Sequence, residues 1–189
     1  MTDVLVIGGG PAGLAAAEVA LEAGLDVTLT DQKPSLARKF LMAGKSGLNI
    51  TQDAPLDHLQ GTIDCAQLDP ILAAFDADAV KRWAEGLGQP IFTGSSGMVF
   101  PVAMKASPLL RAWLQRLAKV DVKTEWRWTG FEGDGHAFDT PGGRRVLRPL
   151  ATIFALGGAS WARLGSDGTW ADIFATQGFP LMPFAPANM

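Results

Sequence analysis

The stretch VLVIGGGPAGLAAAEVALEAGLDVTLTDQ, residues 4–32, stands near the start of a chain of 189 residues. Within it Gly8, Gly10 and Gly13 have the spacing G-x-G-x-x-G, and Asp31 lies near its end. An apolar run precedes the glycines, and an alanine-rich segment follows them. This order is typical of a strand, a tight turn and a helix that together bind a dinucleotide pyrophosphate. A glycine-rich turn without a ligand is the alternative interpretation.

The residues around the glycines predict one β-α-β unit. The apolar run Asp3–Ile7 is typical of a strand buried on both faces of a parallel sheet. Pro11 suits the first turn of a helix that continues over Leu14–Ala23, and Gly24 suits its C-terminal end. The β-branched segment Asp26–Thr30 predicts the second strand, with a right-handed crossover.

Each motif position has a physical role in this prediction. Gly8 permits the tight turn, Gly10 lets the backbone approach a pyrophosphate, and Gly13 lets the helix pack closely on the sheet. Asp31 is placed to accept hydrogen bonds from a ribose diol and would repel a 2′-phosphate, which disfavours NADP and leaves FAD and NAD open. The predicted contacts with the ADP part are Gly8, Gly10, Pro11, Ala12, Gly13, Asp31 and Gln32.

The remaining sequence predicts short helices and strands, and a change to strands near residue 120. Asp76 and Asp78 are candidate helix N-caps, and Ser107-Pro108 is expected to open a helix. The fold class is therefore α/β: a single Rossmann-like domain over 1–189 with a parallel sheet, crossover helices and a small antiparallel meander at 120–150. Helices are expected at 34–42, 68–87, 107–117 and 169–177, an ordered loop at 43–51, and strands at 90–100, 122–128, 130–132, 137–140, 145–147 and 152–156.

Composition excludes several classes of protein. Apolar residues make up 48% and charged residues 19% of the chain, which excludes a disordered polymer. A net charge of −3 gives no general attraction for nucleic acid or an anionic membrane. The single cysteine, Cys65, excludes an intrachain disulfide, and no apolar run is long enough to span a bilayer. A cytoplasmic protein is the expectation, without nucleic-acid or membrane partners.

No metal site and no catalytic residue are predicted. His58 and His136 lack partners at ligand spacing, and no Cys/His cluster occurs. A nucleophile elbow and a general base are likewise not evident, so the catalytic residues stay unknown. This pattern suits a flavoprotein, because the cofactor carries the electron chemistry there.

The stretch ARKFLMAGKSGLNIT, residues 37–51, resembles the aminoacetone oxidase family of bacterial FAD-binding enzymes, within the glutathione-reductase-like flavoproteins. That family carries R-K-x-x-x-S-G-G-G-R-C-N-x-T after the ribose-binding acid. Two further blocks, GMVFPVAMKA at 97–106 and the segment 151–187, resemble the family in the right order. The residues of the first block that match are Arg38, Lys39, Gly44, Asn49 and Thr51.

This chain departs from the family in three respects. Gly47-Leu48-Asn49 stands where the family has R-C-N, and Met98 stands where an arginine is common. Members of the family are about twice as long, with a substrate domain and a final flavin-contacting segment that would lie beyond Met189. The domain is therefore expected to be incomplete relative to the family. Exposed apolar sheet surface would then favour a homo-oligomer.

The resemblance implies FAD as the cofactor. Arg38 and Lys39 would neutralise pyrophosphate charge or stabilise the neighbouring loop, although an exposed helix face is an alternative for both. The segment ALGG, residues 155–158, resembles the family's A-T-G turn beside the cofactor, with an ordinary strand-ending turn as the alternative. Trp128 aligns with the strand that in the family reaches the adenine through its main chain, although a lone tryptophan is more often a core residue. The implied contacts are Arg38, Lys39, Gly44, Asn49, Thr51, Trp128, Ala155, Gly157 and Gly158.

The predicted function is an FAD-dependent oxidoreductase that passes hydride between NAD(P)H, or an oxidisable substrate, and a small-molecule acceptor through flavin N5. An NAD-dependent dehydrogenase is one alternative, and a truncated module that binds flavin without turnover is another. The substrate, the direction of the reaction and the electron donor are left open by the sequence.

Overall fold

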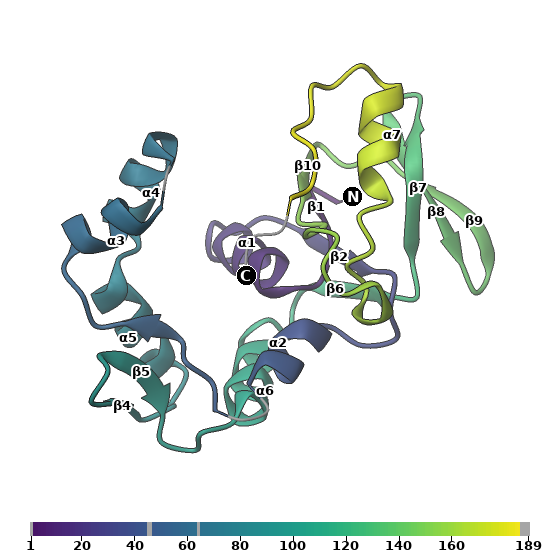
Figure 1. Cartoon of the computed structure of the whole chain (residues 1–189). Coiled ribbons are helices and arrows are strands. Elements are labelled where there is room, and N and C mark those ends of the chain that lie inside the picture. The colour runs from purple at the N-terminus through teal and green to yellow at the C-terminus, as the bar shows by residue number, and fades with distance from the viewer. Residues whose placement is uncertain (1, 45–46, 64, 186–189) are drawn as a thin grey trace. The chain divides into compact units, whose positions relative to one another are not determined.

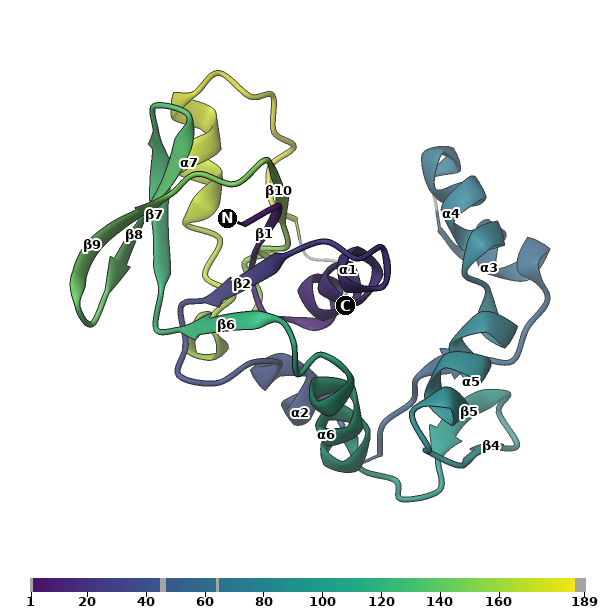
Figure 2. The same cartoon turned by 180° about the vertical axis from the view of Figure 1, so that it is seen from behind.

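The structure is a computed structural model that describes residues 2–44, 47–63 and 65–185. Contacts divide the chain into two compact units: residues 1–39 with 117–189, and residues 40–116. The first unit holds the parallel sheet and the meander, and the second holds short helices around a small antiparallel sheet. Figures 1 and 2 show the elements of both units from opposite sides. No helix in the described ranges is long and apolar enough to cross a membrane.

A four-stranded parallel sheet forms the centre of the first unit, in the order β10-β1-β2-β6. All four residues of β1 are buried, and the first four of β2 are buried as well. This confirms the sequence prediction that the first strand is covered on both faces; the second strand, predicted only from its alternating β-branched residues, is covered in the same way. The strands are β1 (Val4–Ile7), β2 (Val27–Asp31), β6 (Asp121–Thr124) and β10 (Ala151–Phe154).

Helices and strands cover the two faces of this sheet. Helix α1 (Pro11–Glu22) packs against β1, β2 and β10 and ends before Gly24, whose φ of +80° is easily adopted by glycine. Leu5 and Ile7 point to the other face, where they form a buried cluster with Trp128 and Phe138 of the meander. The first unit is therefore a three-layer α/β structure.

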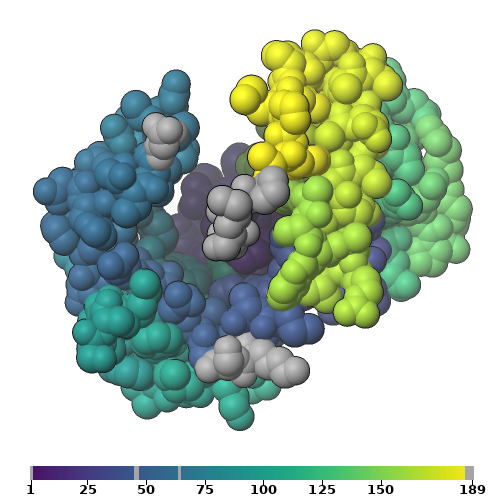
Figure 3. Space-filling model, in the orientation of Figure 1, coloured from purple at the N-terminus to yellow at the C-terminus, as the bar shows by residue number. Residues whose placement is uncertain are grey.

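The meander consists of β7 (Arg127–Glu132), β8 (Gly135–Thr140) and β9 (Gly143–Leu147), paired antiparallel in that order. Helix α7 (Trp170–Thr176) lies beside β7, as Figures 1 and 2 show. Aromatic rings fill the layer between them; the centroids of Phe154 and Phe174 lie 4.9 Å apart. In Figure 3 the yellow residues around α7 lie beside the green strands of the meander.

The second unit is built around the order β3-β5-β4. Its core includes the edge-to-face pair Trp83 and Trp113, whose centroids lie 4.8 Å apart. Its elements are α3 (Leu56–Thr62), α4 (Asp69–Ala74), α5 (Ala77–Gly86), α6 (Ala106–Arg116), β3 (Thr51–Gln52), β4 (Ile91–Thr93), β5 (Met98–Pro101) and the 3₁₀ turn Ala66–Leu68, with α2 (Arg38–Ala43) at the boundary.

Three boundaries predicted from the sequence are wrong. The helix expected from residue 34 begins only at Arg38, because Ala37 has a φ of +53° and its N–H donates to the carbonyl of Gly9. The strand expected at 122–128 is two strands, separated by Glu125 at φ +60°; the first of them, β6, pairs with β2 and belongs to the parallel sheet. Helix α6 begins at Ala106, so Ser107 lies inside its first turn. Helix α3 was not anticipated.

Candidate functional site

A cavity of about 600 Å³ lies in the first unit, where three parallel strands end. Its lining includes Gly8–Ala12 after β1, Asp31 at the end of β2, and Ala155–Gly157 after β10. The carboxyl ends of parallel strands are the usual place for ligands in α/β sheets. The helix that follows the first strand begins at Pro11, so its free N–H groups face the same space.

The three motif glycines are needed for different reasons. A Cβ on Gly13 would collide with the carbonyl oxygen of Gly8, and one on Gly8, at φ +111°, would collide with the carbonyl oxygen of Ala155. Gly10 differs, because apart from its own chain neighbours no atom of the described residues lies within 4 Å of the place where its Cβ would be. Gly8 and Gly13 are therefore required by packing, whereas Gly10 leaves open space in the wall of the cavity.

Asp31 presents a fixed carboxylate to the cavity. Its Oδ2 accepts a hydrogen bond from the Gly9 N–H at 2.9 Å, and its Oδ1 accepts one from the Lys33 N–H at 2.7 Å. Burial raises the pKa of Asp31; the two backbone donors and the charges of Lys33 and Arg38 oppose that rise. Each carboxylate oxygen keeps a second acceptor position, so the group can still receive hydrogen bonds from a diol.

Arg38 and Lys39 both line the cavity and differ in their contacts. The Nε of Arg38 is buried without a hydrogen-bond partner among the described residues, and its Nη1 donates to the Ser35 hydroxyl at 3.3 Å. Lys39 Nζ instead donates to the hydroxyls of Ser160 and Ser166, at 3.2 and 3.0 Å. Arg38 thus has a donor available to an anion, because a buried N–H without a partner is costly.

A second hollow of about 60 Å³ adjoins the same residues and is lined by Asp31, Gln32 and Trp128. Gln32 Nε2 donates to the Gly165 carbonyl at 2.9 Å and lies 3.4 Å from an oxygen of Asp167. The ring of Trp128 is only 6% exposed and belongs to the core cluster, so its side chain is a packing group. A main-chain contact of this strand with a ligand stays a prediction.

The turn after β10 faces the cavity from the other side. The Ala155 N–H donates to the Ile7 carbonyl, which fixes the strand end beside the glycine turn. Gly157 has a φ of +71°, and its carbonyl accepts from the indole N–H of Trp170 at 3.0 Å. The Gly158 carbonyl accepts from the hydroxyl of Ser166. The structure therefore brings the 155–158 segment to the motif, as expected for the A-T-G-like turn.

The other predicted site residues belong to the second unit, and their described contacts lie inside it. A Cβ on Gly44 would lie 2.5 Å from that of Ala106, so close packing explains this glycine. Asn49 Nδ2 contacts the sulfur of Met98 at 3.9 Å, and Thr51 pairs with Val99 in the antiparallel sheet. A cofactor contact of Gly44, Asn49 or Thr51 stays a prediction.

Sequence reasoning missed the apolar part of the cavity wall. Trp170 and Phe174 are four residues apart on α7 and therefore share one face of that helix. Their spacing was visible in the sequence, but nothing local indicated which surface they cover. The further residues are Ala37, Phe154, Leu156, Leu164, Gly165, Ser166 and Leu181.

The residues of the cavity fit a dinucleotide. Open space at Gly10, the available donor of Arg38 and the fixed carboxylate of Asp31 match a pyrophosphate and a ribose. Among the described residues, no group of three His, Cys, Asp or Glu side chains is placed to hold a metal ion.

A family model described as the HI0933-like protein Rossmann domain matches residues 2–185. The chain belongs to this family. The match spans the β-α-β unit, the second unit and the glycine turn after β10, and it agrees with the three-layer α/β structure of the first unit.

Named relatives of this HI0933-like chain are reductases and dehydrogenases. A 3-dehydro-bile acid Δ(4,6)-reductase of Clostridium scindens is 27% identical over 196 residues, which is 99% of this chain and 46% of that protein. A solved 3-ketosteroid-Δ4-(5α)-dehydrogenase of Rhodococcus jostii aligns at a TM-score of 0.59 and 16% identity, covering 82% of this chain and 46% of that one. A flavocytochrome c3 fumarate reductase aligns at 0.56 and 21% identity, covering 83% and 34%. The solved structures establish the likeness in fold, and this chain spans less than half the length of each of these three proteins.

Proposed function

We propose that this HI0933-like chain is the FAD-binding part of a flavin-dependent oxidoreductase. The observation that carries the proposal is the cavity at the ends of β1, β2 and β10, where Gly10 leaves room for a ligand and Arg38 keeps a buried donor without a partner. The names of the relatives support oxidoreductase chemistry. Within these oxidoreductases, we propose that the chain is related to the aminoacetone oxidases, which its residues 37–51 resemble.

The chain's own residues would bind and orient the cofactor. The N-terminal N–H groups of α1 and the guanidinium of Arg38 would face the pyrophosphate, and Asp31 would accept from the adenosine ribose. Trp170, Phe174 and Leu181 would exclude water from the apolar side of the cavity. Bound FAD would supply two-electron redox chemistry at its isoalloxazine ring.

The proposal has four further parts. NAD(P)H would be the electron donor and a small molecule the acceptor. The protein would lie in the cytoplasm and associate with copies of itself. Exposed apolar side chains of the first unit, such as Leu150 at 76% and Met182 at 91%, support self-association. We expect the substrate to be held by a part of the full-length protein outside this chain, since the relatives are more than twice as long.

The test is a titration of the purified chain with FAD, NAD and ADP, followed by protein and flavin fluorescence. FAD should bind, ADP should compete with it, and NAD should bind more weakly, because the proposal places the riboflavin half in contact with protein. Preferential binding of NAD would favour the dehydrogenase alternative. Absence of binding by all three would contradict the proposal. Binding of FAD without NAD(P)H oxidation would indicate a flavin-binding part that needs the rest of the protein.

A further inference from the structure

Lys39 directs its charge at a loop of its own chain. Its Nζ donates to the hydroxyls of Ser160 and Ser166, which are more than a hundred residues away in sequence. Ser166 is 2% exposed and passes the interaction on, because its own hydroxyl donates to the Gly158 carbonyl. Two of the three ammonium protons of Lys39 are therefore used by this loop.

The loop at 157–166 has a closed conformation of its own. Trp161 and Ser166 exchange two backbone hydrogen bonds of 3.2 Å around the short 3₁₀ turn Ala162–Leu164. At its start, Gly157 lies so close that its Cβ would be 3.0 Å from the Ser166 hydroxyl. Ser166 is thus the point at which the loop is fastened.

This loop forms a wall of the cavity, since Gly157, Gly165 and Ser166 all line it. Gln32 Nε2 fastens the loop a second time, through the Gly165 carbonyl. Removing the Lys39 contact should therefore loosen the wall near Ser160 and Ser166 while the contact at Gly165 remains.

Arg38 has the opposite arrangement. Its side chain lines the cavity, and its Nε is buried with no hydrogen-bond partner among the described residues. The charge of Arg38 also lies near enough to Asp31 to lower that group's pKa against the effect of burial. Of the two adjacent cations, Arg38 keeps a buried N–H without a partner among the described residues, whereas Lys39 already uses two of its three N–H groups on the loop.

We propose that Lys39 is a positioning residue that fastens the 157–166 loop to the rim of the nucleotide cavity, and that Arg38 alone of the pair contacts the phosphates. The inference rests on the proposed function, because it assigns a part of the dinucleotide to each cation. It separates two neighbouring residues that the sequence motif treats alike.

The test compares Lys39→Met, Ser166→Ala, their double variant and Arg38→Met, with Lys39→Arg as the conservative control. The first measurement is hydrogen exchange of the 157–166 loop in the protein without ligand. Lys39→Met and Ser166→Ala should each speed this exchange, Lys39→Arg should restore slow exchange, and Arg38→Met should leave it unchanged. Unchanged exchange in Lys39→Met would overturn the proposal.

The second measurement is the affinity for FAD and ADP at low and high salt. Lys39→Met and Ser166→Ala should each weaken FAD binding about 3- to 10-fold, and the double variant should be no weaker than the worse single one, because both remove the same contact. Arg38→Met should weaken binding about 10- to 100-fold and flatten its salt dependence. A flattened salt dependence in Lys39→Met, with normal binding in Ser166→Ala, would show that Lys39 contacts phosphate and would overturn the proposal.

The two measurements distinguish this inference from the proposed function. If the unaltered chain binds neither FAD nor ADP, the proposed function fails, and the hydrogen exchange of the 157–166 loop alone decides whether Lys39 fastens it. If FAD binds but Lys39→Met leaves the hydrogen exchange of the 157–166 loop unchanged, the proposed function stands and the inference is wrong.

Discussion

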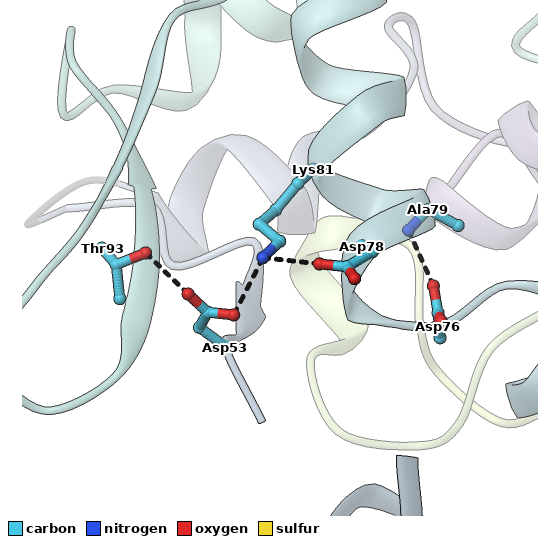
Figure 4. Close-up of polar contacts among 6 residues, drawn as sticks. All are labelled: Asp53, Asp76, Asp78, Ala79, Lys81 and Thr93. Atoms are coloured by element: carbon cyan, nitrogen blue, oxygen red, sulfur yellow. Dashed lines mark hydrogen bonds and ion pairs between the residues drawn. The ribbon is translucent and has the colours of Figure 1, made fainter. Parts of the chain in front are cut away.

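The two units each contain a hollow surrounded by polar groups, and they use those groups differently. The hollow of the second unit, about 280 Å³, is lined by the three carboxylates of Asp53, Asp76 and Asp78, whereas the charged residues of the nucleotide cavity are of both signs: Asp31, Arg38 and Lys39. In Figure 4 these carboxylates are all engaged: Asp53 accepts from Lys81 at 2.8 Å and from Thr93, and Asp78 pairs with the same lysine at 2.6 Å. These contacts raise the pKa of Lys81 to about 12 and lower that of Asp53.

The cavity of the first unit has as many charged residues in its wall and more capacity for new hydrogen bonds. Asp76 in the second unit caps α5 through the Ala79 N–H at 2.8 Å, so its acceptor serves the fold. Arg38 Nε in the first unit has no such partner among the described residues, and Gly10 faces open space. The comparison teaches that the number of charges alone does not mark a ligand site; the first cavity differs by its open space at Gly10 together with a donor that has no partner among the described residues.

The largest effect is expected at Gly10. Gly10→Val should abolish FAD binding, because the side chain would occupy the pyrophosphate path, while the stability of the fold changes by about 1 kcal/mol or less. Gly13→Val is the matched comparison: its Cβ meets the Gly8 carbonyl, so it should destabilise the unit by about 3 kcal/mol or more. Affinity is measured by fluorescence titration and stability by urea unfolding. If folded Gly10→Val still binds FAD, this cavity is not the binding site of the pyrophosphate.

The next effect compares a carboxylate from each unit. Asp31→Asn should weaken FAD binding by about tenfold or more, because a charged acceptor for the ribose is lost. Asp53→Asn, the same change at an engaged carboxylate, should leave affinity within about twofold. Thermal unfolding checks that both variants are folded. An equal loss of FAD affinity in the two variants would show that Asp31 has no special role in binding the ribose.

A smaller effect concerns pH and the buried His136. It is 7% exposed, its Nε2 lies 2.8 Å from the Thr152 hydroxyl, and burial lowers the pKa of His136. As the pH falls below about 6.5, the unfolded chain binds a proton that folded His136 does not, so stability decreases by at most about 1.4 kcal/mol per pH unit. Above about pH 6.5 neutral His136 no longer makes the free energy of unfolding depend on pH.

His136→Phe should reduce this slope, since the ring then has no proton to bind. Urea unfolding between about pH 5 and pH 7 measures the slopes of both proteins. The exposed pair Asp53 and Lys81 should not contribute in this range, because the pKa of Lys81 is about 12 and that of Asp53 is lowered. An identical slope in the variant would mean that other groups cause the pH dependence.

The smallest effect is expected for stability at the exposed ion pairs of the second unit. Lys81→Met should change the unfolding midpoint only slightly, because solvent screens contacts between exposed side chains. The difference from the unaltered chain should shrink further in about 0.5 M NaCl. A large difference that persists at high salt would indicate that this network holds the second unit together.

Local sequence predicted the elements whose conformation is decided by neighbouring residues. The strand at 3–7, the glycine turn, helix α1 and the cap at Asp76 all follow from apolar runs, from glycines and from a capping side chain. The boundaries at Ala37 and Glu125 were missed, because both residues adopt a positive φ that their side chains do not favour. At Ala37, the contact with the Gly9 carbonyl enforces that conformation.

The sequence by itself determined that a dinucleotide-type β-α-β unit opens this chain, because each part of that motif lies within residues that fold against one another locally. Only the tertiary structure decided which residues complete the cavity. It placed Ser166 on Lys39, left Arg38 Nε without a partner among the described residues and turned the ring of Trp128 into the core. These outcomes depend on strands that pair across more than a hundred residues, β1 with β10 above all, and no local pattern encodes which side chains such a pairing brings together.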